Sequence, residues 1–185
     1  MKILGLDLSL NCAGWFLFES DNMSIIDYGY IPNEGEEAEK ILRIYKTLNT
    51  IIKQYKPDRA GIEKEFASKN MDTLMSLSHV HGAVLLLLAQ YNIPYTYYSV
   101  MTAKSKTLDG MKLKKDDGTK KTGSEMKAEV AGKIFEIFGR QNFIKAFTDD
   151  VTDAASIGYT YLVMNGQPVE NKTKKKTVKN KKDVK

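Results

Sequence analysis

The chain has 185 residues, of which 42% are hydrophobic and 28% charged, and this excludes a disordered chain in favour of one globular domain with a sizeable core. The formal net charge of +5 is unevenly placed, because residues 104–127 hold eight lysines against four acids (net +4) and residues 169–185 hold eight lysines against two acids (net +6). The rest of the chain therefore carries a net charge of −5, and an acidic body with two lysine-rich segments indicates a polyanion as partner.

Three consecutive strands open the predicted fold. KILGLDLSL (2–10) is mostly apolar on both faces, so it predicts a central strand that ends near Ser9. AGWFLFES (13–20) and MSIIDYGYI (23–31) follow after short connections, the second through a turn at Asp21–Asn22. Connections this short predict an antiparallel meander.

Helices and strands alternate in the rest of the chain. The spacing of apolar residues and the positions of Pro57 and Pro94 predict, in order, a helix from Glu34 to before Pro57, a strand at 59–65, a helix at 70–91, a strand at 94–100, a loop or β-excursion at 105–123, a helix at 124–138 capped by Ser124, and a helix at 150–164. We therefore expect an α/β domain over residues 1–168, with a mixed five-stranded sheet flanked by helices. Residues 169–185 are predicted to form a lysine-rich disordered tail.

If the first and fourth strands are neighbours in the sheet, this order of elements can bring acidic side chains together. Asp7 lies in the first strand, Glu63 and Glu65 share one face of the fourth strand, and Asp150 and Asp153 share one face of the last helix. Carboxylates packed together repel unless a cation lies between them, and oxygen ligands without His or Cys favour Mg²⁺ or Mn²⁺. The pattern predicts a metal-dependent phosphoryl-transfer enzyme with a two-metal site.

Each acid also has a structural interpretation. Asp149 and Asp150 follow Thr148 and suit a helix N-terminus as caps, which is the commoner role for an acid there. Glu65 suits a solvated strand end. Asp7 is harder to explain in this way, because an acid inside so apolar a strand is costly without a partner.

Other kinds of catalytic centre lack the residues that they need. The sequence contains no GxxxxGK[ST] or GxGxxG phosphate loop and no evident Ser-His-Asp set. We interpret His79 and His81 as packing or surface residues, and the lone Cys12 as a packing residue rather than a nucleophile. The longest apolar run, AVLLLLA at 83–89, is too short to cross a bilayer, so no membrane partner is expected.

Three segments carry a resemblance to a known family. GLDLSLNCAGW (5–15) looks like the first-strand motif of the RuvC family of Holliday-junction resolvases, IEKEFASKNMDTLMSLSHVHGAV (62–84) is similar to its second motif, and DDVTDAASIGY (149–159) resembles its last motif. The segments occur in the family's order and spacing, and the best match is to its shorter bacteriophage members. The resemblance implies an RNase H-like fold, a homodimer, and Mg²⁺-dependent nicking of two opposed strands at a four-way DNA junction.

The resemblance also implies roles for individual residues. Asp7, Glu63, Asp150 and Asp153 match the four carboxylates that hold two Mg²⁺ ions, with Mn²⁺ as the alternative metal and Glu65 as an assisting acid or as the ligand itself in another register. For DNA binding, the resemblance implies that Phe66 inserts at the junction centre, with core packing as its alternative role. It places Lys104 and Lys127 near the scissile phosphate. Lys69 and Lys106 are further DNA-binding candidates.

Our main hypothesis is therefore a homodimeric endonuclease that resolves Holliday junctions, with the apolar helix 70–91 as the interface. The opening strand has an acid where a secretory signal would be apolar, so we expect a cytoplasmic protein, in the host cell if the gene is from a phage. An RNase H-like nuclease for flaps, forks or RNA would use the same acids. A non-catalytic branched-DNA-binding protein is the third hypothesis, although such a protein has no reason to concentrate carboxylates where DNA must lie.

Overall fold

The computed structural model describes residues 1–64, 71–110 and 119–166. Its elements, in chain order, are β1 (Lys2–Asp7), β2 (Cys12–Glu19), β3 (Ser24–Pro32), α1 (Glu37–Tyr55), β4 (Arg59–Glu63), α2 (Met71–Gln90), β5 (Tyr95–Tyr98), α3 (Val100–Thr107), α4 (Gly123–Phe138), a 3-10 turn (Arg140–Asn142) and α5 (Asp149–Asn165). The predicted tail at 169–185 lies outside the described residues.

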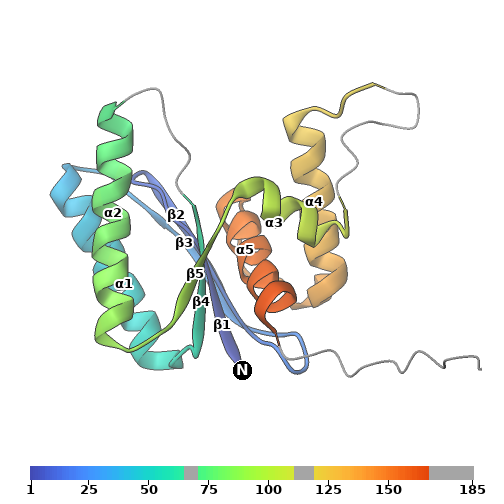
Figure 1. Cartoon of the computed structure of the whole chain (residues 1–185), viewed down its shortest axis with the longest axis horizontal. Helices are drawn as coiled ribbons and strands as arrows, with labels where there is room; N and C mark the ends of the chain where they lie inside the picture. The colour runs from blue at the N-terminus through green and yellow to red at the C-terminus, as the bar shows by residue number, and fades with distance from the viewer. Residues whose placement is uncertain (65–70, 111–118, 167–185) are drawn as a thin grey trace, which may run out of the picture.

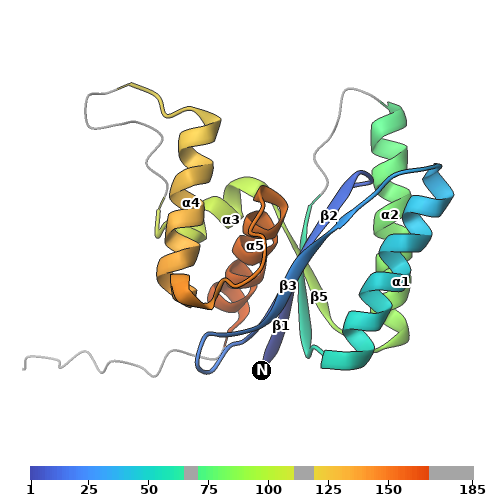
Figure 2. The same ribbon diagram turned by 180° about the vertical axis from the view of Figure 1, so that it is seen from behind.

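One mixed sheet forms the centre of the molecule, in the strand order β3-β2-β1-β4-β5. β1, β2 and β3 are antiparallel to one another, and β4 and β5 run parallel to β1. Helices α1 and α2 cover one face of the sheet and α3, α4 and α5 lie on the other, as Figures 1 and 2 show from opposite sides. The predicted five-stranded mixed sheet flanked by helices is confirmed.

Each face of the sheet buries its own apolar cluster. Leu4 and Leu6 of β1 and Ile62 of β4 point toward α1 and α2 and belong to one apolar cluster. Ile3, at the alternate position of β1, belongs to a second cluster on the side of α4 and α5. The strands are therefore central and covered on both sides, as the apolar sequence of the first strand predicts.

Helix α5 lies directly on the sheet because glycines underlie it. A Cβ atom at Gly5 would come within 2.0 Å of the backbone oxygen of Ala154, and one at Gly14 within 2.1 Å of the backbone oxygen of Asp150. Any side chain at either position would displace the helix. This close approach sets the position of the first turn of α5 over β1 and β2.

Two local predictions are wrong. The strand predicted at 94–100 ends at Tyr98, because Ser99 caps α3 by accepting a hydrogen bond from the Thr102 amide at 3.1 Å, and α3 replaces the start of the predicted loop. Ser124 is not the cap of α4. Thr122 is, because its hydroxyl accepts from the Glu125 amide at 3.2 Å while the Glu125 carboxylate accepts from the Thr122 amide at 2.8 Å.

Helix α2 combines a buried side with an exposed apolar side. By its length and composition alone, this helix is long and apolar enough to cross a membrane. Its longest uninterrupted apolar run is too short to do so. Here it packs on the sheet and on α1, with Val80, Val84, Leu87 and Leu88 fully buried. The helix thus packs through one side only, while Met71, Met75 and Leu86 remain more than half exposed.

Candidate active site

Asp7 and Glu63 leave the sheet side by side. β1 and β4 are parallel neighbours with Leu6 opposite Ile62, so the next residue of each strand, Asp7 and Glu63, lies at the same carboxyl edge. Because side chains alternate along a strand and Leu6 and Ile62 face α1 and α2, both carboxylates point to the side of α5. Asp7 and Glu63 therefore lie together at one edge of the sheet.

The first turn of α5 brings the other two acids to this edge. Gly14 pairs with Asp7 across β1 and β2, and the backbone of Asp150 lies directly above Gly14. Asp153 follows one turn later on the same side of the helix. Thr148 caps α5 by accepting a hydrogen bond from the Val151 amide at 3.4 Å, so the cap interpretation of Asp150 is wrong.

Burial and mutual repulsion raise the pKa values of Asp7, Glu63 and Asp153. Burial is the main cause that raises the pKa of Asp7 to about 8, followed by the charges of Glu63, Asp153 and Asp150. Burial and then the charge of Asp153 raise the pKa of Glu63 to about 7, and burial raises the pKa of Asp153 as well. The mutual effects show that the four carboxylates form one electrostatic cluster.

Two of the predicted lysines face this carboxylate cluster. The charge of Lys104, on α3, offsets part of the rise in the pKa values of Glu63 and Asp153. The charge of Lys127, on α4, does the same for Asp7 and Asp153. Lys127 also forms an ion pair with Asp149 at 2.8 Å, between side chains that are 45% and 69% exposed. Lys106 is exposed and lies two residues from Lys104, on a different face of α3.

The donor set of the cluster suits a hard divalent cation. Its ligands would all be carboxylate oxygens, which Mg²⁺ and Mn²⁺ prefer, and like charges this close repel when no cation lies between them. Within the described ranges, no group of three or more His, Cys, Asp or Glu side chains is already arranged to hold a metal ion. The chemistry of Asp7, Glu63, Asp150 and Asp153 therefore fits the predicted metals, and binding would require their side chains to draw together.

Three predicted site residues, Glu65, Phe66 and Lys69, lie outside the described residues. Two other residues join the site unpredicted. Asp149 pairs with Lys127, and the Cys12 thiol donates a hydrogen bond to Oδ2 of Asp150 at 3.2 Å. Burial and then this hydrogen bond raise the pKa of Cys12 to about 12, so the group is a thiol at neutral pH and not a thiolate nucleophile.

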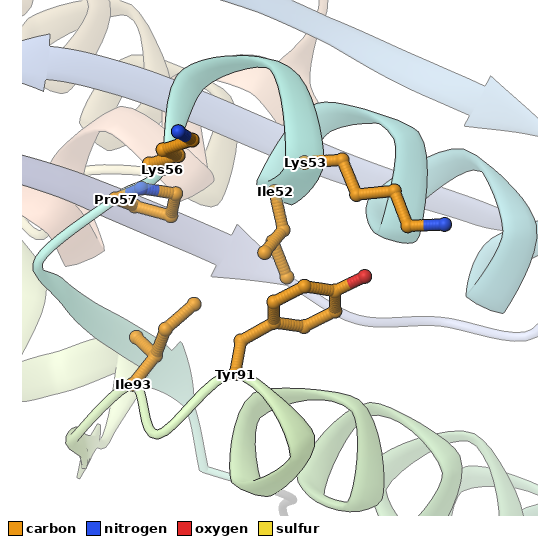
Figure 3. Close-up of a pocket in the computed structure, with 6 residues that line it drawn as sticks. All are labelled: Ile52, Lys53, Lys56, Pro57, Tyr91 and Ile93. Atoms are coloured by element: carbon orange, nitrogen blue, oxygen red, sulfur yellow. The ribbon is translucent and has the colours of Figure 1, made fainter.

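A hollow of about 370 Å³ lies at the opposite end of the sheet, where β4 and β5 begin. Figure 3 shows its lining residues, Ile52, Lys53, Lys56, Pro57, Tyr91 and Ile93. The Tyr91 hydroxyl donates a hydrogen bond to Oδ1 of Asn49 at 2.7 Å. The lining contains no acid and none of the predicted site residues, so the carboxylate cluster and not this hollow is the candidate active site.

Sequence comparisons identify relatives of the chain. Residues 3–120 match the family described as "Crossover junction endodeoxyribonuclease RuvC". A protein of that name from Chloroflexus aurantiacus is 33% identical over 108 residues, which span 56% of this chain and 66% of the relative. Another from Caldicellulosiruptor saccharolyticus is 27% identical over 168 residues, which span 88% of this chain and 93% of the relative, so this second match reaches beyond the family's matched region.

A solved structure has the same fold. It is described as "T. thermophilus RuvC in complex with Holliday junction substrate", and it superposes with a TM-score of 0.71 at 16% sequence identity. The superposition covers 90% of this chain and 98% of that chain. The predicted RNase H-like fold is confirmed by this likeness.

Proposed function

This chain belongs to the RuvC family of crossover junction endodeoxyribonucleases, and we propose that it resolves Holliday junctions by paired, metal-dependent hydrolysis of phosphodiester bonds. The observation that carries the proposal is the convergence of Asp7, Glu63, Asp150 and Asp153 at one edge of the sheet, with Lys104 and Lys127 beside them. The likeness to a RuvC structure in complex with a Holliday junction supports branched DNA as the substrate.

The four carboxylates would hold two divalent cations, Mg²⁺ or Mn²⁺. Bound there, the cations would supply an activated water and stabilise the leaving oxygen. The protein's own residues determine where this happens. β1 and β4 hold Asp7 and Glu63 rigidly within the sheet, α5 adds Asp150 and Asp153, and the lysines offset the negative charge that the carboxylates present to a phosphate.

We further propose that two copies of the chain pair through α2, because two symmetric cuts require two sites. Met75, Gly82 and Leu86 follow one another at seven and four residues along the exposed side of α2, so they share one face. No described atom lies within 4 Å of the position that a Cβ would occupy at Gly82. A partner helix can therefore approach closely at this point, with apolar side chains on either side.

A cleavage assay on a labelled four-way junction with Mg²⁺ tests the proposal, comparing wild type with Asp7→Asn, Glu63→Gln and the exposed control Glu34→Gln. We expect paired symmetric nicks from wild type and from the control, and a loss of roughly 10²–10³-fold or more in both site variants while junction binding persists. Tight binding without cutting by wild type would indicate the non-catalytic binding protein. Stronger cutting of flaps, forks or RNA would indicate a nuclease with another substrate.

The dimer is tested separately by Leu86→Glu, which places a charge on the exposed face of α2. Sedimentation should show a dimer for wild type and a monomer for the variant, which retains its fold because Leu86 is 59% exposed. Paired cutting by a wild-type monomer would contradict this interface.

A further inference from the structure

The beginning of β2 reaches the active site through one hydrogen bond. Cys12, the first residue of β2, donates its thiol hydrogen to Oδ2 of Asp150 at 3.2 Å, across 138 residues of sequence. Among the described residues, Asp7, Glu63 and Asp153 accept no such hydrogen bond. Asp150 is therefore the member of the cluster whose orientation is fixed by a neighbouring side chain.

The loop that precedes Cys12 is itself held in place. The Ser9 hydroxyl donates to the Cys12 carbonyl oxygen at 2.5 Å and accepts from the Cys12 amide at 3.0 Å. On the other side, the backbone amide of Asn33 donates to the carbonyl oxygen of Asn11 and its side-chain Nδ2 donates to that of Leu10, each at 3.0 Å. Both ends of the loop are thus fixed by hydrogen bonds, and the position of the thiol follows from them.

The carboxylate on the other side of this bond is equally constrained. Gly14 lies beneath Asp150 at a distance that leaves no space for a Cβ, and Thr148 fixes the beginning of α5. The loop is held by its hydrogen bonds and the first turn of α5 by its cap and its close packing on Gly14, and the Cys12–Asp150 hydrogen bond joins the two.

We propose that Cys12 is a positioning residue that holds Asp150 in the orientation required for cation binding. The inference rests on the proposed function, since it assigns Asp150 as a metal ligand. A thiol is a weak hydrogen-bond donor, so it orients one carboxylate oxygen while leaving most of the negative charge available to a cation. Residues that orient metal ligands in this way typically affect metal affinity by roughly 10–100-fold, and a weak donor belongs at the lower end of this range.

The test compares Cys12→Ala with Cys12→Ser, two variants that differ by one hydroxyl group. Mn²⁺ binding to the full chain is measured directly, by electron paramagnetic resonance of free Mn²⁺ in a titration without DNA. We expect Cys12→Ala to weaken Mn²⁺ binding by about 10-fold and Cys12→Ser to stay within about threefold of wild type, because a hydroxyl also donates. In the cleavage assay, Cys12→Ala should need a higher Mn²⁺ concentration for half-maximal rate, with junction affinity unchanged.

The outcomes separate this inference from the proposed function. If Cys12→Ala binds Mn²⁺ as wild type does while Asp7→Asn does not, the positioning role is wrong and the metal site stands. Equal weakening in Cys12→Ala and Cys12→Ser would also overturn the role, because packing of the sulfur and not donation would then be the cause. If wild type binds no Mn²⁺, the proposed function itself fails.

Discussion

At the carboxyl ends of β1 and β4, the two faces of the central sheet have opposite chemistry, although the same strands form both. Toward α1 and α2, β1 and β4 present Leu6 and Ile62, which are at most 1% exposed and lie in a closed apolar cluster. Toward α5, the adjacent positions Gly5, Asp7 and Glu63 offer little apolar surface and two carboxylates with raised pKa values. Along each strand, a buried apolar side chain that stabilises the fold is therefore followed directly by a carboxylate whose ionised form destabilises it.

The difference shows how the molecule tolerates a cluster of negative charge. The apolar face stabilises β1 and β4 independently of pH, because its buried members carry no charge. The strands can then hold carboxylates on the other face in an environment that disfavours their ionised form. Changes on the two faces should therefore differ in size, in sign and in dependence on pH.

The largest expected effect on stability belongs to the apolar face. Leu6→Ala should lower the free energy of unfolding by about 2–5 kcal/mol, because it removes buried methyl groups and leaves a cavity between the sheet and its helices. The loss should be the same at pH 5 and pH 9, since no titratable group changes. Urea denaturation in EDTA measures it, with Leu42→Ala as a control at a side chain that is 50% exposed. A loss that varies strongly with pH would mean that the two faces are coupled.

Overpacking beneath α5 should have the next largest effect. Gly5→Ala should cost about 1–3 kcal/mol, because the new methyl group would lie 2.0 Å from a backbone oxygen of α5. Junction cleavage should fall as well, since the same helix carries Asp150 and Asp153. The matched control is Gly132→Ala within α4, where no described atom lies within 4 Å of the added Cβ. There the substitution should stabilise the protein by about 0.5–1 kcal/mol, and equal destabilisation by both would disprove the role of close approach.

The contrast between the faces also explains what the sequence could predict. The strands and the helices α1 and α2 follow from apolar periodicity, which the closed face reproduces. Asp7 and Glu63 could be placed together because parallel neighbours end at the same edge. The contact of α5 with the sheet could not be derived from periodicity, although glycines inside strands, such as Gly5 and Gly14, are a signal of close approach.

Polar contacts account for the features that the sequence analysis predicted wrongly or missed. Helix α3 begins because the Ser99 hydroxyl caps it, and the apolar pattern of the preceding strand gave no reason to end it there. The Cys12–Asp150 hydrogen bond joins residues 138 positions apart, so no local pattern could reveal it. Thr122 and Glu125 do show the spacing of a capping box, and that signal was available in the sequence.

Removing a charge from the side of the sheet that faces α5 should stabilise the protein, whereas the two substitutions Leu6→Ala and Gly5→Ala should destabilise it. The pKa of Asp7 is raised to about 8, above the value of about 4 in an unfolded chain, so the folded state binds the proton more tightly. The contribution of protonated Asp7 to folding stability is fully present below pH about 4 and is lost as the pH rises through about 8. Without metal, Asp7→Asn should therefore be more stable than wild type by about 1–2 kcal/mol at pH 9, with a smaller difference at pH 5.

Thermal unfolding in EDTA at the two pH values measures this difference, with Glu34→Gln as the control at an exposed acid. The control should change stability by less than about 0.5 kcal/mol. If Asp7→Asn is less stable than wild type at pH 9, then Asp7 has a stabilising partner in the metal-free protein and the face is not electrostatically strained. Added Mg²⁺ should stabilise wild type and leave Asp7→Asn almost unchanged.

The smallest expected effect concerns lysines at the two ends of the sheet. Lys127 lies beside the carboxylates, whereas Lys53 lines the hollow at the other end (Figure 3). Lys127→Ala should weaken junction binding a few-fold and lower the slope of log affinity against log salt by about 1, because one phosphate contact is lost. Lys53→Ala removes the same charge from the chain but should leave the slope unchanged. Equal slopes for both variants would mean that net charge, rather than the position of Lys127 at the active site, determines DNA binding.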